Sequence, residues 1–325
     1  MERLVLVPFE KPPFHLESSL KIIAEVPDVR IVYVESKNEE EWIKNLKDIE
    51  VAFPSGAFTK EMIDSSDKLR MIQTVSVGFN HIDILAALDK EVIVCNVPEV
   101  MSETVAQHTW ALILALSKEI VNGDKLVRGG GWRPRLMGVN LWGKTLGIVG
   151  LGRIGRRVAL KGKHAFDMRI IAYDPYVDVE TAQTFGVEMT DLQNLMTKSD
   201  VVSINCPLSK DTEGLVGEKE LSRMKETALI VNTARGKIID QKALIQLLKS
   251  RKIRGAGLDV FKEEPIESDS PLLKMDNVIL TPHIASSTVP IFNETARRGC
   301  ENVVRYLRGD SPKWQINYST TPWLH

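Results

Sequence analysis

The sequence KTLGIVGLGRIG, residues 144–155, carries the clearest structural signal of this chain. Its first half is an apolar run between a lysine and a glycine, which predicts a buried β-strand. Its second half, GLGRIG, is followed by RRVALKGKHAF at 156–166, which has the pattern of a helix. A strand that turns through closely spaced glycines into a helix is typical of a doubly wound α/β domain.

The glycines of this turn have separate physical tasks. Gly150 allows the tight turn, Gly152 lets the backbone approach a pyrophosphate, and Gly155 lets the helix pack closely on the strand. The free N–H groups at the start of the helix would bind that pyrophosphate. A plain structural turn is the alternative, but the complete strand–turn–helix context favours a dinucleotide site.

An acidic residue follows at the distance that this motif requires. A second strand pattern ends at Asp174, about 20 residues after the last glycine, where a carboxylate binds the hydroxyls of the adenosine ribose. Its charge would repel the 2′-phosphate of NADP, and PYVDV at 175–179 contains no arginine or lysine that could neutralise one. We therefore expect NAD as the cofactor.

Length and composition describe an ordinary globular protein. The 325 residues suggest about two domains, and the net charge of −1 gives no reason to expect a nucleic-acid partner. No apolar stretch approaches the roughly 20 residues that cross a bilayer, and the N-terminus lacks the pattern of a signal peptide. The three cysteines are widely spaced, which favours a reducing cytoplasm and argues against a disulfide framework or a metal site.

Strand and helix patterns alternate in two blocks. The first block has helical patterns at 18–26 and 39–46, between strand patterns at 4–9, 29–35, 50–56, 71–78 and 92–97. A long helix follows from Met101, with Ser102 as its N-cap. The second block has strand patterns at 144–150, 168–174, 200–206, 226–234, 253–260 and 277–283, and a helical pattern at 290–309. This alternation predicts two doubly wound α/β domains, and the last helix is free to return to the first.

Polar residues stand at the ends of the last three predicted strands. Arg235 follows the first of these strands, the carboxylates Asp259, Glu263 and Glu264 lie at or after the end of the second, and His283 ends the third. Ligands of open α/β sheets bind at the carboxyl ends of the strands. We therefore expect these side chains to converge where the nicotinamide would lie.

Such a set suits the reduction of a 2-keto acid. Histidine can supply the proton that the developing alkoxide needs, and a carboxylate on its other ring nitrogen would fix the tautomer. An arginine can hold the substrate carboxylate and polarise the keto oxygen. Each residue alone would more often be an ordinary surface or strand-end group, but together, beside a dinucleotide turn, they indicate an active site.

Five stretches carry a family resemblance: VSVGFNHID (75–83), GLGRIG (150–155), NTARGKIID (232–240), GLDVFKEEP (257–265) and TPHIASST (281–288). In this order and spacing the chain resembles, over nearly its whole length, the D-isomer-specific 2-hydroxyacid dehydrogenase family, which includes phosphoglycerate, glycerate, D-lactate and hydroxypyruvate/glyoxylate enzymes. The resemblance implies an NAD-binding Rossmann domain at 101–287. That domain would be inserted in a discontinuous, flavodoxin-like substrate domain made of 1–100 and 288–325.

The resemblance also assigns roles to matching positions. Arg235 would bind the substrate and Glu264 would partner His283, the acid–base. The backbone N–H groups of Val77 and Gly78 would help Arg235 and His283 hold the substrate. Residues expected to bind NAD are Thr104, Gly150, Gly152, Arg153, Ile154, Gly155, Asp174, Cys206, Pro207, Thr212, Thr233, Ala234, Asp259 and Ala285. Among them, Asp259 would contact the nicotinamide amide.

The family further implies a homodimer formed through the NAD domain. We interpret the basic and aromatic stretch 121–144 as an arm that reaches the neighbouring subunit, and not as a nucleic-acid site. Phosphoglycerate enzymes of the family usually carry an arginine in the loop that matches 53–55, and residues 51–59 contain none. We therefore expect a small, unphosphorylated 2-keto acid as substrate.

Other functions on the same fold stay open at this point, because a fold does not settle a function. A phosphoglycerate dehydrogenase is one of them, and a formate or phosphite dehydrogenase is another, since Arg235 suits any small anion. A non-catalytic, NAD-sensing protein of the co-repressor kind is the alternative from a different class.

Overall fold

A computed structural model describes residues 2–8, 14–34, 39–54, 56–132 and 136–317. The chain divides into two compact units, Met1–Met101 with Ser287–His325, and Ser102–Ser286. Parts of some predicted segments lie outside the described residues: position 9 of the strand pattern 4–9, position 35 of the pattern 29–35, Ser55 of the pattern 50–56 and of the loop 53–55, 133–135 of the predicted arm, and 318–325 of the predicted substrate domain. No helix within the described ranges is both long and apolar enough to cross a membrane.

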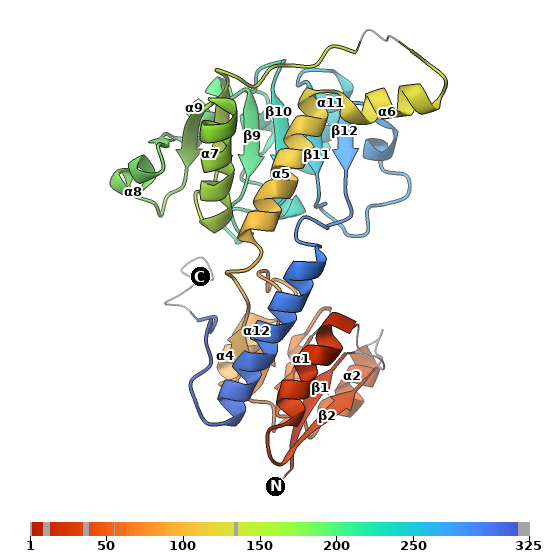
Figure 1. The fold of residues 1–325 in the computed structure, drawn as a ribbon, viewed down its shortest axis with the longest axis vertical. Coiled ribbons are helices and arrows are strands. Elements are labelled where there is room, and N and C mark those ends of the chain that lie inside the picture. The colour runs from red at the N-terminus through yellow and green to blue at the C-terminus, as the bar shows by residue number, and fades with distance from the viewer. Residues whose placement is uncertain (1, 9–13, 35–38, 55, 133–135, 318–325) are drawn as a thin grey trace. The chain divides into compact units, whose positions relative to one another are not determined.

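The first unit is built on a five-stranded parallel sheet with the order β2-β1-β3-β4-β5. The strands are β1 (Arg3–Val7), β2 (Val29–Tyr33), β3 (Val51–Ala52), β4 (Met71–Gln73) and β5 (Ile93–Cys95). Its helices are α1 (Phe14–Ala24), α2 (Glu39–Leu46), α3 (Lys60–Asp64), α4 (Ile84–Asp89) and α12 (Val289–Leu307). This strand order is that of flavodoxin-like folds. The last helix lies beside α1 (Figure 1), so the unit is discontinuous in sequence, as predicted.

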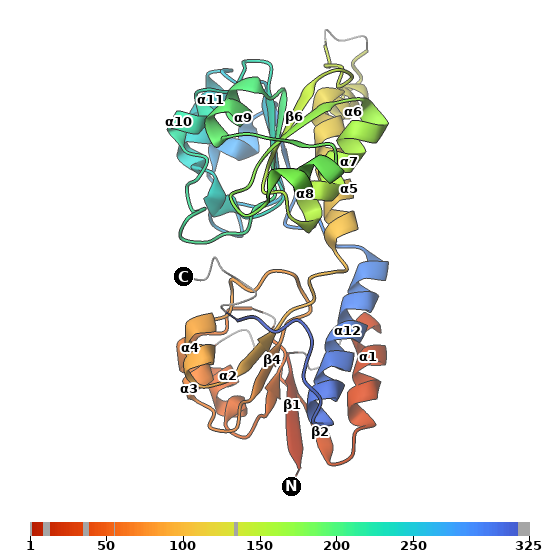
Figure 2. The same cartoon turned by 90° about the vertical axis from the view of Figure 1, so that its left-hand side faces the viewer.

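Helices cover both faces of this sheet, with α1 and α12 on one face and α2, α3 and α4 on the other (Figure 2). Val5 and Val7 of β1 point into the cluster formed with α1 and α12, whereas Leu6 points into the opposite cluster. Successive side chains of a strand face opposite sides. A strand buried on both sides therefore needs an uninterrupted apolar run, which is how β1 could be read from the sequence.

The second unit contains a seven-stranded parallel sheet with the order β12-β11-β10-β9-β6-β7-β8. Its strands are β6 (Thr145–Val149), β7 (Arg169–Tyr173), β8 (Glu188–Met189), β9 (Val201–Ile204), β10 (Leu229–Asn232), β11 (Gly255–Leu258) and β12 (Val278–Leu280). The chain proceeds outward from β6 through β7 to β8, then crosses back to β9 on the other side of β6. Such a reversal marks the place where α/β sheets bind ligands.

Helices flank this sheet on both sides as well (Figure 2). They are α5 (Ser102–Ser117), α6 (Ile120–Arg128), α7 (Arg153–Phe166), α8 (Val179–Thr184), α9 (Leu192–Lys198), α10 (Glu218–Leu221) and α11 (Gln241–Lys249). Two short 3₁₀ helices, η1 (Gly236–Ile238) and η2 (Pro271–Lys274), complete the unit. Residues of α5 and α7 share one core cluster, and those of α9, α10 and α11 share the other.

The observed strands are shorter than the predicted ones. The pattern at 200–206 gives a strand only at Val201–Ile204, because a proline at 207 cannot donate a sheet hydrogen bond and the chain turns away before it. Ser102 is the first residue of α5 rather than the residue that precedes it. The short strand β8 and the small helices α3, α4, α8 and α10 have too few residues for a clear periodicity.

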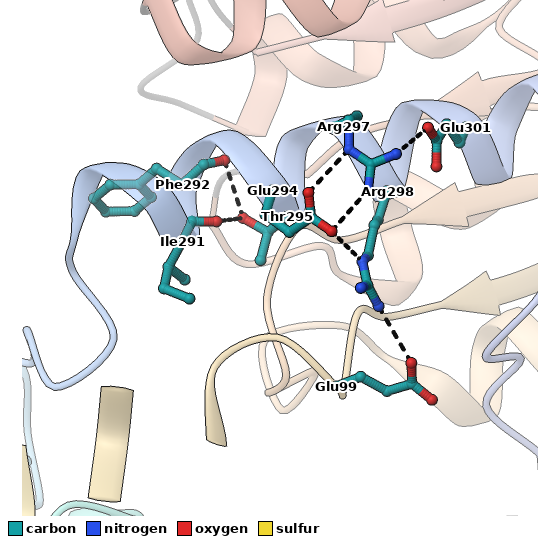
Figure 3. Close-up of polar contacts among 8 residues, drawn as sticks. All are labelled: Glu99, Ile291, Phe292, Glu294, Thr295, Arg297, Arg298 and Glu301. Carbon is teal, nitrogen blue, oxygen red and sulfur yellow. Dashed lines mark hydrogen bonds and ion pairs between the residues drawn. The ribbon is translucent and has the colours of Figure 1, made fainter. Parts of the chain in front are cut away.

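An ionic network joins α12 to the segment that leads out of the first unit (Figure 3). Arg298 Nη1 lies 3.2 Å from Glu99 Oε2, and Arg298 Nε lies 2.7 Å from Glu294 Oε1. Arg297 contacts the same Glu294 oxygen at 2.7 Å and also pairs with Glu301. These guanidinium groups, chiefly Arg297, lower the pKa of Glu294 to about 2.

Candidate active site

The glycine turn lies at the switch point, between β6 and α7. Gly150 has a φ of +93°, and a Cβ built on it would lie 2.5 Å from the backbone nitrogen of Cys206. A Cβ on Gly155 would lie 2.1 Å from the carbonyl oxygen of Gly150. Both positions therefore exclude side chains for reasons internal to the fold.

Gly152 differs from the other two glycines. A Cβ built on it meets no atom of the described residues within 4 Å, and Gly152 is the N-cap of α7. The fold itself does not require a glycine here, so the open space above it is where a ligand can approach the backbone. The helix α7 begins directly after this glycine, and the free N–H groups of a first helical turn suit a pyrophosphate.

Asp174 follows β7 and is held by the glycine turn. One carboxylate oxygen accepts a hydrogen bond from the N–H of Leu151 at 2.8 Å, and the other accepts from the N–H of Tyr176 at 2.9 Å. The carboxylate is thus fixed beside the turn, where the adenosine ribose of a dinucleotide would lie. Together with the open approach at Gly152, this arrangement fits NAD.

The other predicted NAD-binding residues of the second unit lie in its loops and first helical turns. Thr104 lies in the first turn of α5, and Arg153 and Ile154 begin α7. The Thr212 hydroxyl donates to the carbonyl of Pro207 at 2.6 Å, which closes the loop after β9.

Cys206 and Thr233 lie deeper in the same unit. Burial raises the pKa of the Cys206 thiol to about 12, which keeps it protonated and unreactive at neutral pH. The hydroxyl of Thr233 lies 2.9 Å from that of Thr109 on α5. This hydrogen bond connects the loop after β10, which includes Ala234, to the helix that covers it.

Arg235, Glu264 and His283 come from three neighbouring strands. The carboxyl ends of β10, β11 and β12 lie level, because Asn232 pairs with Leu258 in register and Leu258 pairs with Leu280. The loops that leave these strands therefore start at one edge of the sheet. This parallel geometry is what brings the three side chains to one place.

Arg235 is held by a tight loop. Asn232, itself buried, donates from Nδ2 to the Arg235 carbonyl at 2.9 Å, and its Oδ1 accepts from the N–H of Ala234 at 3.0 Å. A Cβ on Gly236 would lie 1.9 Å from the backbone of Phe261, so only glycine lets the two loops approach this closely. Burial lowers the pKa of Arg235, and the nearby Glu264 carboxylate partly offsets this effect. The guanidinium stays charged, and an anion would compensate its burial.

His283 and Glu264 form a hydrogen-bonded pair. His283 Nδ1 lies 2.7 Å from Glu264 Oε2, and Glu264 Oε1 accepts a hydrogen bond from the N–H of Phe261 at 3.0 Å. About half of the His283 side chain is exposed (48%), so solvent or a ligand can reach the ring. Because Glu264 engages Nδ1, the ring nitrogen available for proton transfer is Nε2.

Asp259 is fully buried and binds the loop that carries His283. Its Oδ1 accepts from the hydroxyl of Thr281 at 2.6 Å and from the N–H of Ile284 at 2.9 Å, and its Oδ2 accepts from the N–H of Ala285 at 2.9 Å. Burial alone would raise the pKa of Asp259, but the hydrogen bonds from His108, Thr281 and these two amides outweigh it and lower the pKa. A contact between Asp259 and the nicotinamide amide stays a prediction.

Sequence reasoning missed His108 and Thr281. The His108 ring on α5 lies 3.1 Å from the Thr281 hydroxyl. A signal was present, since His108 stands three residues after Val105 and four before Leu112, both buried positions of the same helix. This spacing places a polar ring on the face of α5 that covers the sheet.

Val77 and Gly78 lie in the first unit, in the loop after β4. Asn96 donates from Nδ2 to the Val77 carbonyl at 2.8 Å, and the Ser76 hydroxyl donates to the Gly78 carbonyl at 2.6 Å. These bonds occupy carbonyl oxygens and hold the loop in shape. No group of three or more His, Cys, Asp or Glu side chains suited to a metal ion occurs in the part of the chain that the structure describes.

Known proteins match this chain over most of its length. The family model for the "D-isomer specific 2-hydroxyacid dehydrogenase, NAD binding domain" matches residues 110–285. A glyoxylate reductase of Korarchaeum cryptofilum is 41% identical over 282 residues, which cover 85% of each chain. A D-3-phosphoglycerate dehydrogenase of Methanocaldococcus jannaschii is 40% identical over 95% of this chain, which spans 59% of that relative. Among solved structures, D-lactate dehydrogenase from Aquifex aeolicus, complexed with NAD and lactic acid, is 31% identical with a TM-score of 0.83, covering 95% of this chain and 96% of that one.

A doubly wound sheet with a dinucleotide turn at its switch point defines a dinucleotide-binding α/β protein. The chain belongs to the D-isomer specific 2-hydroxyacid dehydrogenase family. It is therefore an NAD-dependent enzyme that acts on the CH–OH group of 2-hydroxy acids, as the sequence predicted.

Proposed function

We propose that the protein reduces a small, unphosphorylated 2-keto acid to its D-2-hydroxy acid with NADH. The observation that carries this proposal is the 2.7 Å hydrogen bond between His283 and Glu264 at the strand edge where Arg235 also stands. A proton donor, its orienting carboxylate and an anion-binding cation are the three groups that the reduction needs. A relative named glyoxylate reductase supports the choice of a small substrate.

Each of these side chains has a separate role in the proposed reduction. Arg235 binds the substrate carboxylate through its guanidinium and polarises the keto oxygen. When bound, NADH would supply the hydride that the keto carbon accepts. His283 donates a proton from Nε2 to the oxygen as its negative charge develops, and Glu264 stabilises the imidazolium and holds its orientation through Nδ1. A 2-keto acid, NADH and one proton thus give a D-2-hydroxy acid and NAD⁺.

The two parts of the chain take different roles in this proposal. Residues 101–287 bind NAD, and the discontinuous part, 1–100 with 288–325, supplies Val77 and Gly78 for the substrate carboxylate. The backbone N–H groups of such a loop bind a small anion without adding a charge. Arg235 and His283 provide the remaining substrate contacts.

A homodimer through the NAD-binding part belongs to the same proposal. Large apolar side chains are exposed along the predicted arm, which includes most of α6, and Trp132, Met137 and Trp142 are each at least 70% exposed. A partner surface would bury these side chains, since exposed apolar groups gathered in one segment are typical of interfaces. The cytoplasm remains the expected location, on the basis of three buried free cysteines among the described residues.

The competing substrate is phosphoglycerate, because a relative of similar identity carries that name. The loop after β3 argues against it. Phe53 is buried in an apolar cluster, and no arginine occurs at 51–59. A phosphate carries nearly two negative charges and calls for cationic or N–H partners. An unphosphorylated keto acid is therefore favoured over phosphohydroxypyruvate.

One assay tests the proposal. NADH oxidation is followed with glyoxylate, hydroxypyruvate, pyruvate, phenylpyruvate and phosphohydroxypyruvate, and we expect turnover with one or more of the first four. Preference for phosphohydroxypyruvate would favour the phosphoglycerate alternative. Tight NADH binding with no turnover across the panel would refute the reductase and favour a non-catalytic NAD sensor. Formate and phosphite with NAD⁺ complete the panel, and turnover with either would identify the remaining alternative.

A further inference from the structure

His108 of α5 has no role in the chemistry proposed above, yet it contacts the loop that carries His283. Its Nε2 lies 3.1 Å from Thr281 Oγ1 and 3.5 Å from Asp259 Oδ1. The Thr281 hydroxyl donates its single proton to Asp259 at 2.6 Å. Thr281 can therefore only accept from His108, which makes His108 Nε2 the donor.

Asp259 connects the His108–Thr281 pair to the backbone around His283 through hydrogen bonds. Its two carboxylate oxygens accept from the N–H groups of Ile284 and Ala285, and its carbonyl accepts from the N–H of His283 at 2.8 Å. His283 has a φ of +53°, a left-handed conformation that a residue with a side chain adopts only when its surroundings enforce it. The hydrogen bonds of Asp259 hold the backbone of His283 in this conformation.

The helix α5, which carries His108, is itself fixed by hydrogen bonds to neighbouring elements. Trp110 donates from Nε1 to the Val158 carbonyl of α7 at 3.1 Å, and Thr109 contacts Thr233 after β10. One turn of α5 therefore connects α7, the loop of Arg235 and, through His108, the loop of His283. A buried helix with several such bonds holds its side chains more rigidly than a surface loop can.

We propose that His108 is a positioning residue for the reduction. Acting through Thr281 and Asp259, it holds the 281–285 loop so that His283 keeps its left-handed φ and its ring stays on Glu264. The role in the reaction rests on the proposed function, whereas the hold on the loop does not depend on it. His108 touches neither substrate nor cofactor in this proposal, and it acts by geometry alone.

Two pairs of variants test this proposal. His108→Gln keeps an N–H donor at nearly the position of Nε2, whereas His108→Phe keeps a ring and removes the donor. Thr281→Ser keeps the hydroxyl, whereas Thr281→Val keeps the shape and removes it. His164→Phe is the matched control, because His164 is an exposed histidine of α7 in the same unit.

Each variant is measured in two ways. Hydrogen–deuterium exchange of the peptide that contains 283–285 reports on the loop without any substrate, and steady-state reduction reports kcat and KM. We expect faster exchange and a roughly 10–100-fold lower kcat in His108→Phe and Thr281→Val, since small misplacements of a reacting group cost about this much. His108→Gln, Thr281→Ser and the control should resemble the parent in both measurements.

The two measurements separate the two proposals. Unchanged exchange in His108→Phe and Thr281→Val would overturn the positioning role, whatever the activity. A His108→Gln variant as impaired as His108→Phe would also overturn it, because packing rather than the hydrogen bond would then be responsible. A parent that reduces none of the keto acids would refute the proposed function alone, while the exchange data would still decide whether His108 holds the loop.

Discussion

Replacing Gly152 by alanine should separate cofactor binding from folding. A Cβ at this position meets no described atom within 4 Å, and the residue does not have a positive φ, so alanine fits the free protein. The same methyl group would stand where a pyrophosphate must approach the first N–H groups of α7. We therefore expect normal stability and weakened NADH binding.

The expected loss of NADH affinity follows from the hydrogen bonds to the pyrophosphate that the methyl group would prevent. A hydrogen bond from a backbone N–H to a charged group contributes about 1.5–3 kcal/mol, so the loss of one such bond should weaken NADH binding roughly 10–150-fold. Gly155→Ala should behave in the opposite way, because its Cβ would lie 2.1 Å from the Gly150 carbonyl. Overpacking of this kind costs about 1–3 kcal/mol, which lowers Tm by roughly 2–12 °C for a domain of this size.

Fluorescence titration with NADH and thermal unfolding without ligand measure the two effects. Gly123→Ala in α6 is a suitable control, since its Cβ also meets nothing within 4 Å of the described residues. We expect parental NADH affinity there. An unchanged Kd for NADH in Gly152→Ala would refute the assignment of this space to the pyrophosphate, and a large drop in Tm for the same variant would contradict the geometry of the turn.

Three further perturbations test other parts of the molecule. His283→Ala should lower kcat by roughly 10²–10⁴-fold, the range of general acid catalysis, with NADH affinity unchanged in titration, and near-parental turnover would remove His283 from the chemistry. Asp174→Ala should reduce the preference for NADH over NADPH, measured as the ratio of kcat/KM, and an unchanged ratio would exclude Asp174 from the ribose site. The lowered pKa of Glu294, about 2, means that its contribution to stability is present above the ordinary glutamate pKa of about 4.3 and is lost as the pH falls toward 2. The urea midpoints of the parent and Glu294→Gln should therefore differ near neutral pH and converge in acid, and a constant difference would contradict the lowered pKa.

Local patterns were sufficient to predict most of the fold. The apolar runs of β1 and β6 are buried on both faces, and this requirement leaves a continuous signal in the sequence. The requirement for glycine at 155 is likewise local, because a Cβ there would meet the Gly150 carbonyl five residues earlier. At Gly150 the positive φ is local, whereas the close approach to Cys206 comes from a distant segment. Short elements such as β8 escaped prediction because two residues have no measurable period.

The sequence by itself determined the class of this protein and the side chains that stand at the strand ends. The alternation of strand and helix patterns predicted parallel sheets. The carboxyl ends of parallel strands lie at one edge of a sheet. The polar residues at those strand ends could therefore be identified from the sequence. These inferences need only the neighbours of each residue in the chain, together with the regular geometry of strands and helices.

Only the tertiary structure decided how His283 is held. The link from His108 to Thr281 joins residues 173 positions apart, and both are ordinary residue types in their local context. The left-handed φ of His283 depends on the buried Asp259 carboxylate, which accepts bonds from several segments at once. A hydrogen bond between distant segments leaves no periodic trace in the sequence, since it requires one pair of atoms to meet rather than a whole face to be apolar.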